Sequence, residues 1–321
     1  MKISVSKPVI GREEIKNVNQ ALRSRAISGF FGKYIPEFEK KFSRFSQTKF
    51  GVSVSSGTTA LHLALATLNI SKGDEVIIPA ITNMATYFSV IYQGAKPIPI
   101  DVNPQTLNID PSLIERKITK KTKAIIVVHL FGLPVQMDPI MKIVKKYKIK
   151  LIEDCAEAHG AEYKGKRVGS FGDFGCFSFY ANKIISTGEG GMLTTNNKNN
   201  ATKAKNLKEL AFGKKNKFIH SDIGYNYRLT NIQAAIGCGQ MRKIKTIINS
   251  KRKIAERYQK LLDYKNYFIL PNDDKNCFNV YWMYLLILKD EYVDQREFIM
   301  KKLKINGVET REGFVSATLQ K

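Results

Sequence analysis

Continuous runs of Ile, Val and Leu alternate with segments of helical periodicity over the first two thirds of the chain. Seven such runs predict strands: 50–54, 75–80, 96–102, 123–131, 149–156, 172–180 and 190–196. Between them, helical patterns run over 55–68, near 86–93 and over 137–148. Apolar runs without alternation are typical of strands covered on both faces. The pattern therefore predicts an α/β fold with a parallel-rich sheet.

The pattern changes after Leu229. Residues 231–262 predict one long helix or two in series, weakened locally by Gly237 and Gly239. The apolar run 280–288 predicts a strand, and 296–305 predicts a helix. We therefore expect two domains, a large α/β domain over residues 1–235 and a smaller C-terminal α/β domain over residues 236–321.

Composition adds a strong positive charge. The net charge is +24, from 52 basic and 28 acidic residues, which suggests anionic partners. The lysines lie in short scattered clusters such as 120–123, 145–150 and 214–217. Because no basic tail, zinc-finger spacing or RNA-binding aromatic motif accompanies them, we expect phosphorylated small molecules rather than nucleic acid.

Cysteine and histidine usage predicts neither a disulfide framework nor a metal site. The four cysteines are far apart without a CxxC motif, and the four histidines form no HExxH motif. The N-terminus lacks an apolar signal core, and the longest apolar run, 124–135, is too short to span a bilayer. We expect a cytoplasmic protein that does not enter the membrane.

The first candidate site lies at the start of the helix after strand 50–54. Ser56, Gly57, Thr58 and Thr59 precede the apolar helical pattern. Free backbone N–H groups and the helix dipole make such a position an anion site, and Gly57 lets the backbone approach a phosphate closely. An ordinary N-cap explains the same residues about equally well.

Two further segments carry candidate chemistry. Asp154 follows an apolar strand, at an edge where α/β proteins bind ligands, and could pair with a protonated ring nitrogen. A cap or a structural ion pair is the alternative for this carboxylate. Ser178 offers a hydroxyl to a phosphate, and Lys183 offers an amine beside the glycines of 187–191. An amine, an acid for the pyridine nitrogen and an anion cradle together match the needs of pyridoxal 5'-phosphate.

These motifs, in this order, resemble the DegT/StrS family of sugar-nucleotide aminotransferases that depend on pyridoxal phosphate. The resemblance runs from 28–42 to 308–311 and is most specific over 153–192 and 223–237. It implies the aspartate aminotransferase-like fold of the type I transferases. It also implies transfer of an amino group from L-glutamate to a nucleotide-linked 4-keto-6-deoxyhexose, as in perosamine- and viosamine-type enzymes of surface glycan biosynthesis.

The resemblance also implies roles for individual residues. Lys183 would form the Schiff base and shuttle a proton, Asp154 would pair with the pyridine nitrogen, and Glu157 would hydrogen-bond the ring hydroxyl. Phosphate binding would fall to Gly57, Thr58, Ser178 and, from the partner subunit of a homodimer, Asn226. His159 would lie behind the site.

Three alternatives remain open at this point. The acceptor could be another keto sugar, such as a 3-keto sugar or a keto-octulosonate. Related sugar dehydratases replace the lysine by histidine, so Lys183 argues against that activity. A protein with the same fold but impaired catalysis is the third alternative, because family members usually continue well past the motif that ends at Arg311; the smaller domain is therefore expected to be incomplete.

Overall fold

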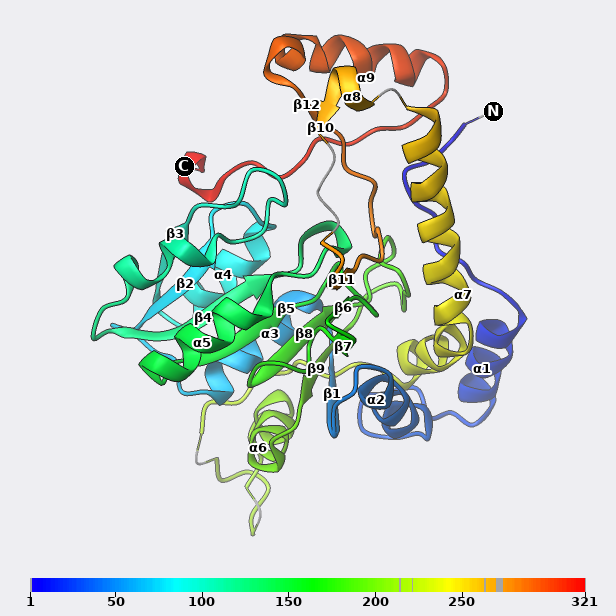
Figure 1. Cartoon of the computed structure of the whole chain (residues 1–321). Helices are drawn as coiled ribbons and strands as arrows, with labels where there is room; N and C mark the ends of the chain where they lie inside the picture. Colours follow the sequence, from blue (N-terminus) through cyan, green and yellow to red (C-terminus); the bar gives the residue numbers. More distant parts are fainter. Residues whose placement is uncertain (1, 214, 221, 263, 270–273, 321) are drawn as a thin grey trace.

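The computed structural model describes residues 2–213, 215–220, 222–262, 264–269 and 274–320. Its centre is a seven-stranded sheet in the order β1-β9-β8-β5-β4-β2-β3 (Figure 1). The strands are β1 (Phe50–Val54), β2 (Glu75–Pro79), β3 (Lys96–Ile100), β4 (Thr122–Val128), β5 (Lys150–Asp154), β8 (Phe174–Ser178) and β9 (Gly191–Thr195). Only β9 pairs antiparallel with its neighbours β1 and β8, so the predicted parallel-rich α/β sheet is confirmed.

Helices cover both faces of this sheet. One face packs against α3 (Gly57–Thr67), α4 (Met84–Tyr92) and α6 (Lys198–Lys208), and the other against α5 (Met137–Tyr147). Neighbouring strand residues alternate between the two faces. Ile152 of β5 is buried in the core on the side of α3, α4 and α6, and Leu151 is buried in the core on the side of α5. This alternation decides which way the last two residues of β5 point.

A further layer of helices joins the N-terminal segment to the part of the chain that follows residue 230. Helices α1 (Arg12–Arg23) and α2 (Tyr34–Phe45) pack against α7 (Asn231–Leu261), the long helix at the right of Figure 1. The segment 231–262 therefore forms one helix rather than two. Its two glycines allow close contacts, because a Cβ would lie 2.6 Å from the Phe38 ring at Gly237 and 3.0 Å from Glu14 at Gly239.

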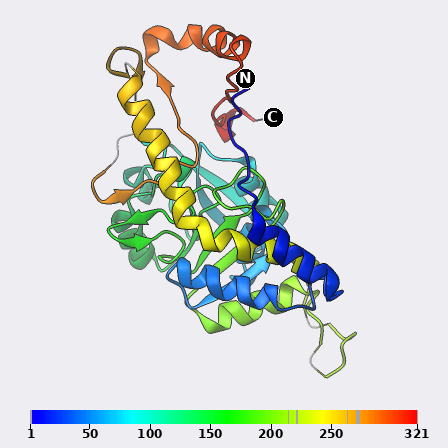
Figure 2. The same cartoon turned by 90° about the vertical axis from the view of Figure 1, so that its right-hand side faces the viewer.

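Beyond α7 the chain forms short elements. They are α8 (Tyr264–Tyr267), β10 (Phe268–Ile269), β11 (Cys277–Phe278), β12 (Ile287–Leu288) and α9 (Arg296–Ile305). Strand β11 joins the small strands β6 (Glu162–Tyr163) and β7 (Lys166–Arg167). Figure 2 shows α7 running from the layer formed by α1 and α2, at its lower end, to the C-terminal segment beyond its upper end. The division into two domains at residues 235 and 236 stays a prediction.

The strand predicted over 280–288 is wrong for most of its length. Only Ile287–Leu288 is a strand, because Tyr281 takes a positive φ of 47° that interrupts the extended conformation. Val280 and Trp282 are instead buried against the sheet domain, and Val280 N–H donates to Gly132 O at 3.2 Å. The apolar character of the run therefore serves packing beside the sheet rather than a strand ladder.

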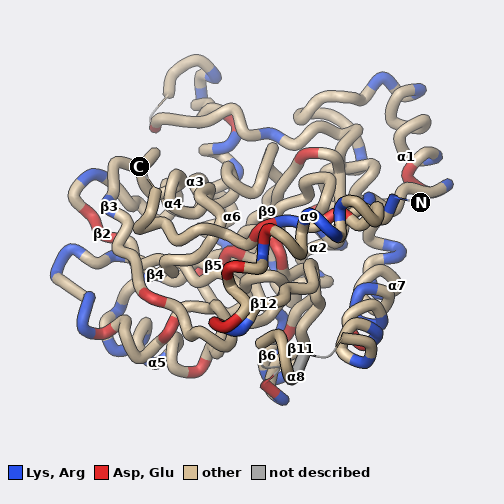
Figure 3. Tube along the Cα trace, turned by 90° about the horizontal axis from the view of Figure 1, so that it is seen from above, with Lys and Arg blue, Asp and Glu red and all other residues tan. Residues whose placement is uncertain are grey.

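Basic residues are spread over many elements, and several of them follow one another along α7 (Figure 3). Among the described residues, no helix is both long enough and apolar enough to cross a bilayer.

Candidate active site

The N-terminus of α3 forms the first part of the site. Ser56 caps the helix, since its Oγ accepts the Thr59 N–H at 3.1 Å. The first bond of the helical ladder is Ala60 N–H to Ser56 O, so the N–H groups of Gly57 and Thr58 lie ahead of it. The N-cap and the anion site are therefore compatible, because different residues serve them.

Ser178 closes this end of the helix. It is the last residue of β8 and is buried, and a Cβ on Gly57 would lie only 2.8 Å from its Cβ. Any side chain at position 57 would fill the space between helix and strand. The structure thus brings Gly57, Thr58 and Ser178 together at one corner, where N–H groups and a hydroxyl suit a phosphate.

Asp154 ends β5 on the face that carries α4. Its Oδ2 accepts the Thr86 hydroxyl at 2.9 Å, and its Oδ1 accepts the Ala156 N–H at 3.1 Å. Burial raises the pKa of this carboxyl, whereas the two hydrogen bonds and the charge of Lys183 favour its ionised form. A buried carboxylate with an incomplete set of donors can bind a cationic N–H of a ligand.

Lys183 and Glu157 form a buried pair beside it. Lys183 Nζ lies 3.6 Å from Glu157 Oε1, and the lysine side chain is only 12% exposed. Glu157 Oε2 also accepts the Phe131 N–H at 2.9 Å. Burial raises the pKa of Glu157 to about 7, against the opposing effect of Lys183. Near neutral pH this carboxyl can therefore either donate or accept a proton.

Aromatic rings that the sequence did not single out cover the lysine. Lys183 Nζ lies 3.9 Å from the centre of the Trp282 ring. Phe131 stacks between Trp282 and Phe314, with ring centroids 6.2 Å and 5.5 Å apart. The only signal in the sequence was that Trp282 is the single tryptophan of the chain. Its distance of about a hundred residues from Lys183 hid the contact.

His159 lies behind the site, among the rings of Phe42, Phe177 and Phe179. Neither ring nitrogen has a hydrogen-bond partner among the residues that the structure describes. Burial lowers the pKa of His159 to about 3, so the imidazole is neutral at physiological pH. This environment suits support of the site by packing.

Asn226 lies apart from the buried group. It is exposed, and its flanking residues Tyr225 and Tyr227 stack with ring centroids 5.0 Å apart. Tyr227 O accepts the Ser55 N–H at 2.9 Å, which ties this segment to the residues just before α3. Asn226 therefore lies close to the start of α3, but its side chain is exposed.

The residues present fit pyridoxal phosphate. The corner at α3 suits its phosphate, Asp154 its ring nitrogen and Lys183 its aldehyde carbon, and all are buried or half-buried on the same side of the sheet.

Comparison with known proteins also indicates an aminotransferase. The model of the DegT/DnrJ/EryC1/StrS aminotransferase family matches residues 8–321. GDP-perosamine synthase of Escherichia coli O157:H7 is 42% identical over 312 residues, 97% of this chain and 84% of the relative. GDP-perosamine synthase of Caulobacter vibrioides is 40% identical, with 98% and 84% covered. EpsN of Bacillus subtilis, whose name describes a pyridoxal phosphate-dependent aminotransferase, is 38% identical over 81% of this chain and 69% of the relative.

Solved structures show the same fold. DesV of S. venezuelae superposes with a TM-score of 0.89 at 29% identity, covering 96% of this chain and 81% of that chain. Helicobacter pylori PseC, an aminotransferase of pseudoaminic acid biosynthesis, gives a TM-score of 0.92 at 27% identity, covering 100% and 87%.

We predict that Glu157 makes the cofactor-free protein less stable as the pH rises. Its pKa is raised from 4.5 to about 7 by folding, so its contribution to stability is complete below pH 4.5 and is lost as the pH rises through 7. Relative to Glu157→Gln, the wild-type free energy of unfolding should fall by on the order of 3 kcal/mol between pH 4.5 and pH 8. Urea unfolding at a series of pH values measures this difference.

The exposed Glu297→Gln variant is the control, and its curve should run parallel to the wild type. If the Glu157→Gln curve also runs parallel to the wild type, Glu157 titrates as it does in the unfolded chain.

Proposed function

Because the chain belongs to the DegT/DnrJ/EryC1/StrS aminotransferase family, we propose that it transfers the amino group of L-glutamate to the keto carbon of a GDP-linked 4-keto-6-deoxyhexose. The protein is a sugar-nucleotide aminotransferase that uses pyridoxal phosphate. The perosamine-type product is favoured over a viosamine-type product because two of the relatives named above are GDP-perosamine synthases. We also propose that the reaction takes place in the cytoplasm.

The observation that carries the proposal is the buried group of Lys183, Glu157 and Asp154 beside the start of α3. When bound, the cofactor supplies an electron sink that stabilises negative charge on the carbon bearing the amino group. Lys183 Nζ would hold the cofactor and, as a free amine, would move the proton between the donor carbon and the cofactor. Asp154 holds a proton on the pyridine nitrogen by charge.

The remaining residues of the site orient the cofactor and cover the amine of Lys183. Gly57, Thr58 and Ser178 would bind the phosphate, which would hold the cofactor where its ring nitrogen can reach Asp154. Glu157 donates to or accepts from the ring hydroxyl, and its bond from Phe131 N–H holds it in place. Trp282 and Phe131 cover Lys183 and exclude water from the amine.

We further propose that the working unit is a homodimer with shared active sites. Large aromatic side chains are exposed in two pairs, Phe30 with Phe31 and Phe88 with Tyr92. Ring contacts link them to the segment that carries Asn226, since Arg228 packs on Phe30 and His62 contacts both Tyr92 and Tyr225. An apolar surface around an exposed asparagine suits a second copy of the chain, whose phosphate corner that asparagine would complete.

The substrate prediction is tested by mass spectrometry. Wild-type protein with L-glutamate should convert the GDP-linked 4-keto-6-deoxyhexose to an amino sugar at least about tenfold faster than the UDP-linked one. Asp154→Asn should bind the cofactor and hardly turn over, whereas the exposed Asp294→Asn should match the wild type. Amination of the UDP-linked sugar alone would contradict the nucleotide assignment.

The shared site is tested by mixing Lys183→Ala subunits with Asn226→Asp subunits. In a mixed dimer one site carries both defects and the other is intact. Random exchange should therefore restore about a quarter of the wild-type activity, from two nearly inactive parents. If every group of a site came from one chain, mixing would restore nothing.

A further inference from the structure

Glu153 is a fully buried carboxylate directly beside Asp154, and the mechanism above gives it no role. Successive strand residues point to opposite faces of the sheet. Glu153 therefore faces away from the candidate cofactor site, on the same side of β5 as Leu151. Its contacts belong to other segments than those of Asp154. A buried charge is costly unless it is fully hydrogen-bonded, so its partners indicate its purpose.

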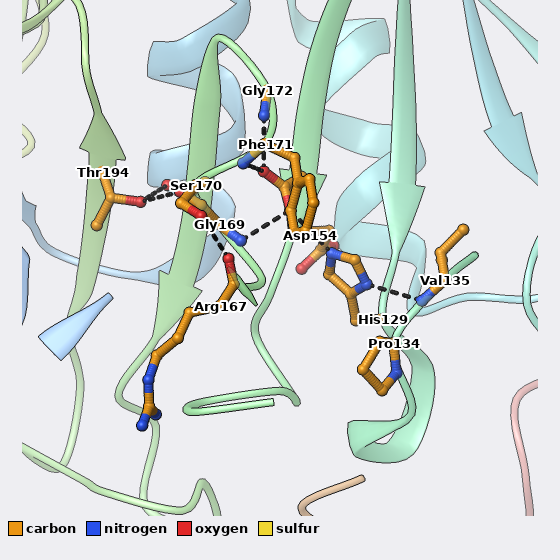
Figure 4. Close-up of polar contacts among 12 residues, drawn as sticks. His129, Pro134, Val135, Asp154, Arg167, Gly169, Ser170, Phe171, Gly172 and Thr194 are labelled. Atoms are coloured by element: carbon orange, nitrogen blue, oxygen red, sulfur yellow. Dashed lines mark hydrogen bonds and ion pairs between the residues drawn. The ribbon is translucent and has the colours of Figure 1, made fainter. Parts of the chain in front are cut away.

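Four donors surround this carboxylate. Its Oε1 accepts the N–H groups of Phe171 and Gly172, both at 2.8 Å, and its Oε2 accepts the Gly169 N–H at 2.7 Å. The fourth contact is His129 Nε2, 3.2 Å from Oε2. Figure 4 shows these backbone groups and the imidazole converging on one point.

His129 is oriented by a second bond. Its Nδ1 accepts the Val135 N–H at 3.0 Å, so the ring proton lies on Nε2 and donates to Glu153. Its backbone N–H donates to Asp154 O at 3.1 Å, and Asn108 Oδ1 accepts the N–H of the next residue, Leu130, at 3.1 Å. The histidine therefore joins the ends of β4 and β5 through both its side chain and its main chain.

This network reaches both carboxylates of the candidate pocket. It fixes the main chain of β5 at the residue that carries Asp154. It also fixes the turn after His129, where Phe131 takes a φ of 52° and donates its N–H to Glu157. A left-handed conformation is unfavourable for phenylalanine. The hydrogen bonds on His129 and Leu130 hold the two residues before it and so support this conformation.

We propose that Glu153 and His129 are positioning residues. From the opposite face of the sheet they hold the main chain that orients the carboxyl groups of Asp154 and Glu157. The inference rests on the proposed role of Asp154. It assigns Glu153 a purpose distinct from that of its neighbour, although both end the same strand.

A metal site is the competing explanation. His129, Glu153 and Cys155 offer ligand atoms within 4.8 Å of one another. However, both nitrogens of His129 and both oxygens of Glu153 already have hydrogen-bond partners, and a cation would have to displace them. The observed donors neutralise the carboxylate without an ion.

Hydrogen exchange in the cofactor-loaded protein tests the network. In Glu153→Gln the amide would place its own N–H₂ or a single oxygen against the four donors, which leaves some unsatisfied. We expect the peptide covering 167–173 to exchange at least about tenfold faster than in the wild type. Glu162→Gln is the matched control, because Glu162 pairs with Arg167 at the edge of the same loop but does not touch the backbone donors. Unchanged exchange in Glu153→Gln would overturn the proposal.

Kinetics separate positioning from simple stabilisation. The kcat of Glu153→Gln should fall about tenfold to a hundredfold while the KM for glutamate changes little, because misaimed groups act in the chemical step. The pH dependence of the bound cofactor's absorbance should shift, since Asp154 would hold the ring nitrogen less well. His129→Gln, which keeps a donor near the Nε2 position, should be less impaired than His129→Leu. Equal losses in these two variants, or an unshifted absorbance profile, would contradict the positioning role.

Metal analysis of the loaded wild type completes the test. Less than stoichiometric zinc or other transition metal supports the hydrogen-bonded network, and one equivalent bound per chain and lost in His129→Leu overturns it. Failure of the wild type to aminate any nucleotide sugar would contradict the proposed function, whereas the exchange measurement would still decide the network.

Discussion

Buried charge at the carboxyl edge of the parallel strands is the constraint on which the rest of the structure depends. Asp154, Glu157 and Lys183 are held together with little access to water. Each isolated ion would be costly there, so the surrounding chain must supply donors and a counter-charge. Thr86, the Ala156 N–H and the Phe131 N–H supply part of that need. The part they leave unmet is what a charged cofactor can satisfy.

The scaffold follows from this constraint. A parallel sheet covered on both faces brings strand ends and helix starts to one edge, where β5, β8 and α3 meet. The segments that complete the site come from distant parts of the chain. Trp282 arrives from beyond α7 and packs on Lys183, and Trp282 Nε1 donates to Asn182 O at 2.8 Å, directly beside that lysine. The aromatic cover and the reactive amine are thus fixed together.

The predictable part of the fold was the part set by local pattern. Continuous apolar runs located the seven central strands because both faces of the sheet are covered. Gly57 starts the helix after β1, Asp154 and Ser178 end strands, and Lys183 follows in the loop after β8. The run 280–288 misled for the same reason, since apolar residues buried by packing look like those of a covered strand. Trp282 and Phe131 could not be predicted, because their place beside Lys183 depends on tertiary contacts. Separating Glu153 from Asp154 required knowing which face of β5 each one occupies.

Lys183 is proposed as the amine that binds the cofactor, and borohydride reduction of the loaded protein followed by peptide mapping tests this role. Reduction makes the bond between lysine and cofactor permanent, so the added mass marks the residue. We expect the added mass on the peptide containing Lys183, its loss in Lys183→Ala and its retention in the exposed control Lys166→Ala. Stoichiometric labelling of any other lysine in the wild type would contradict it.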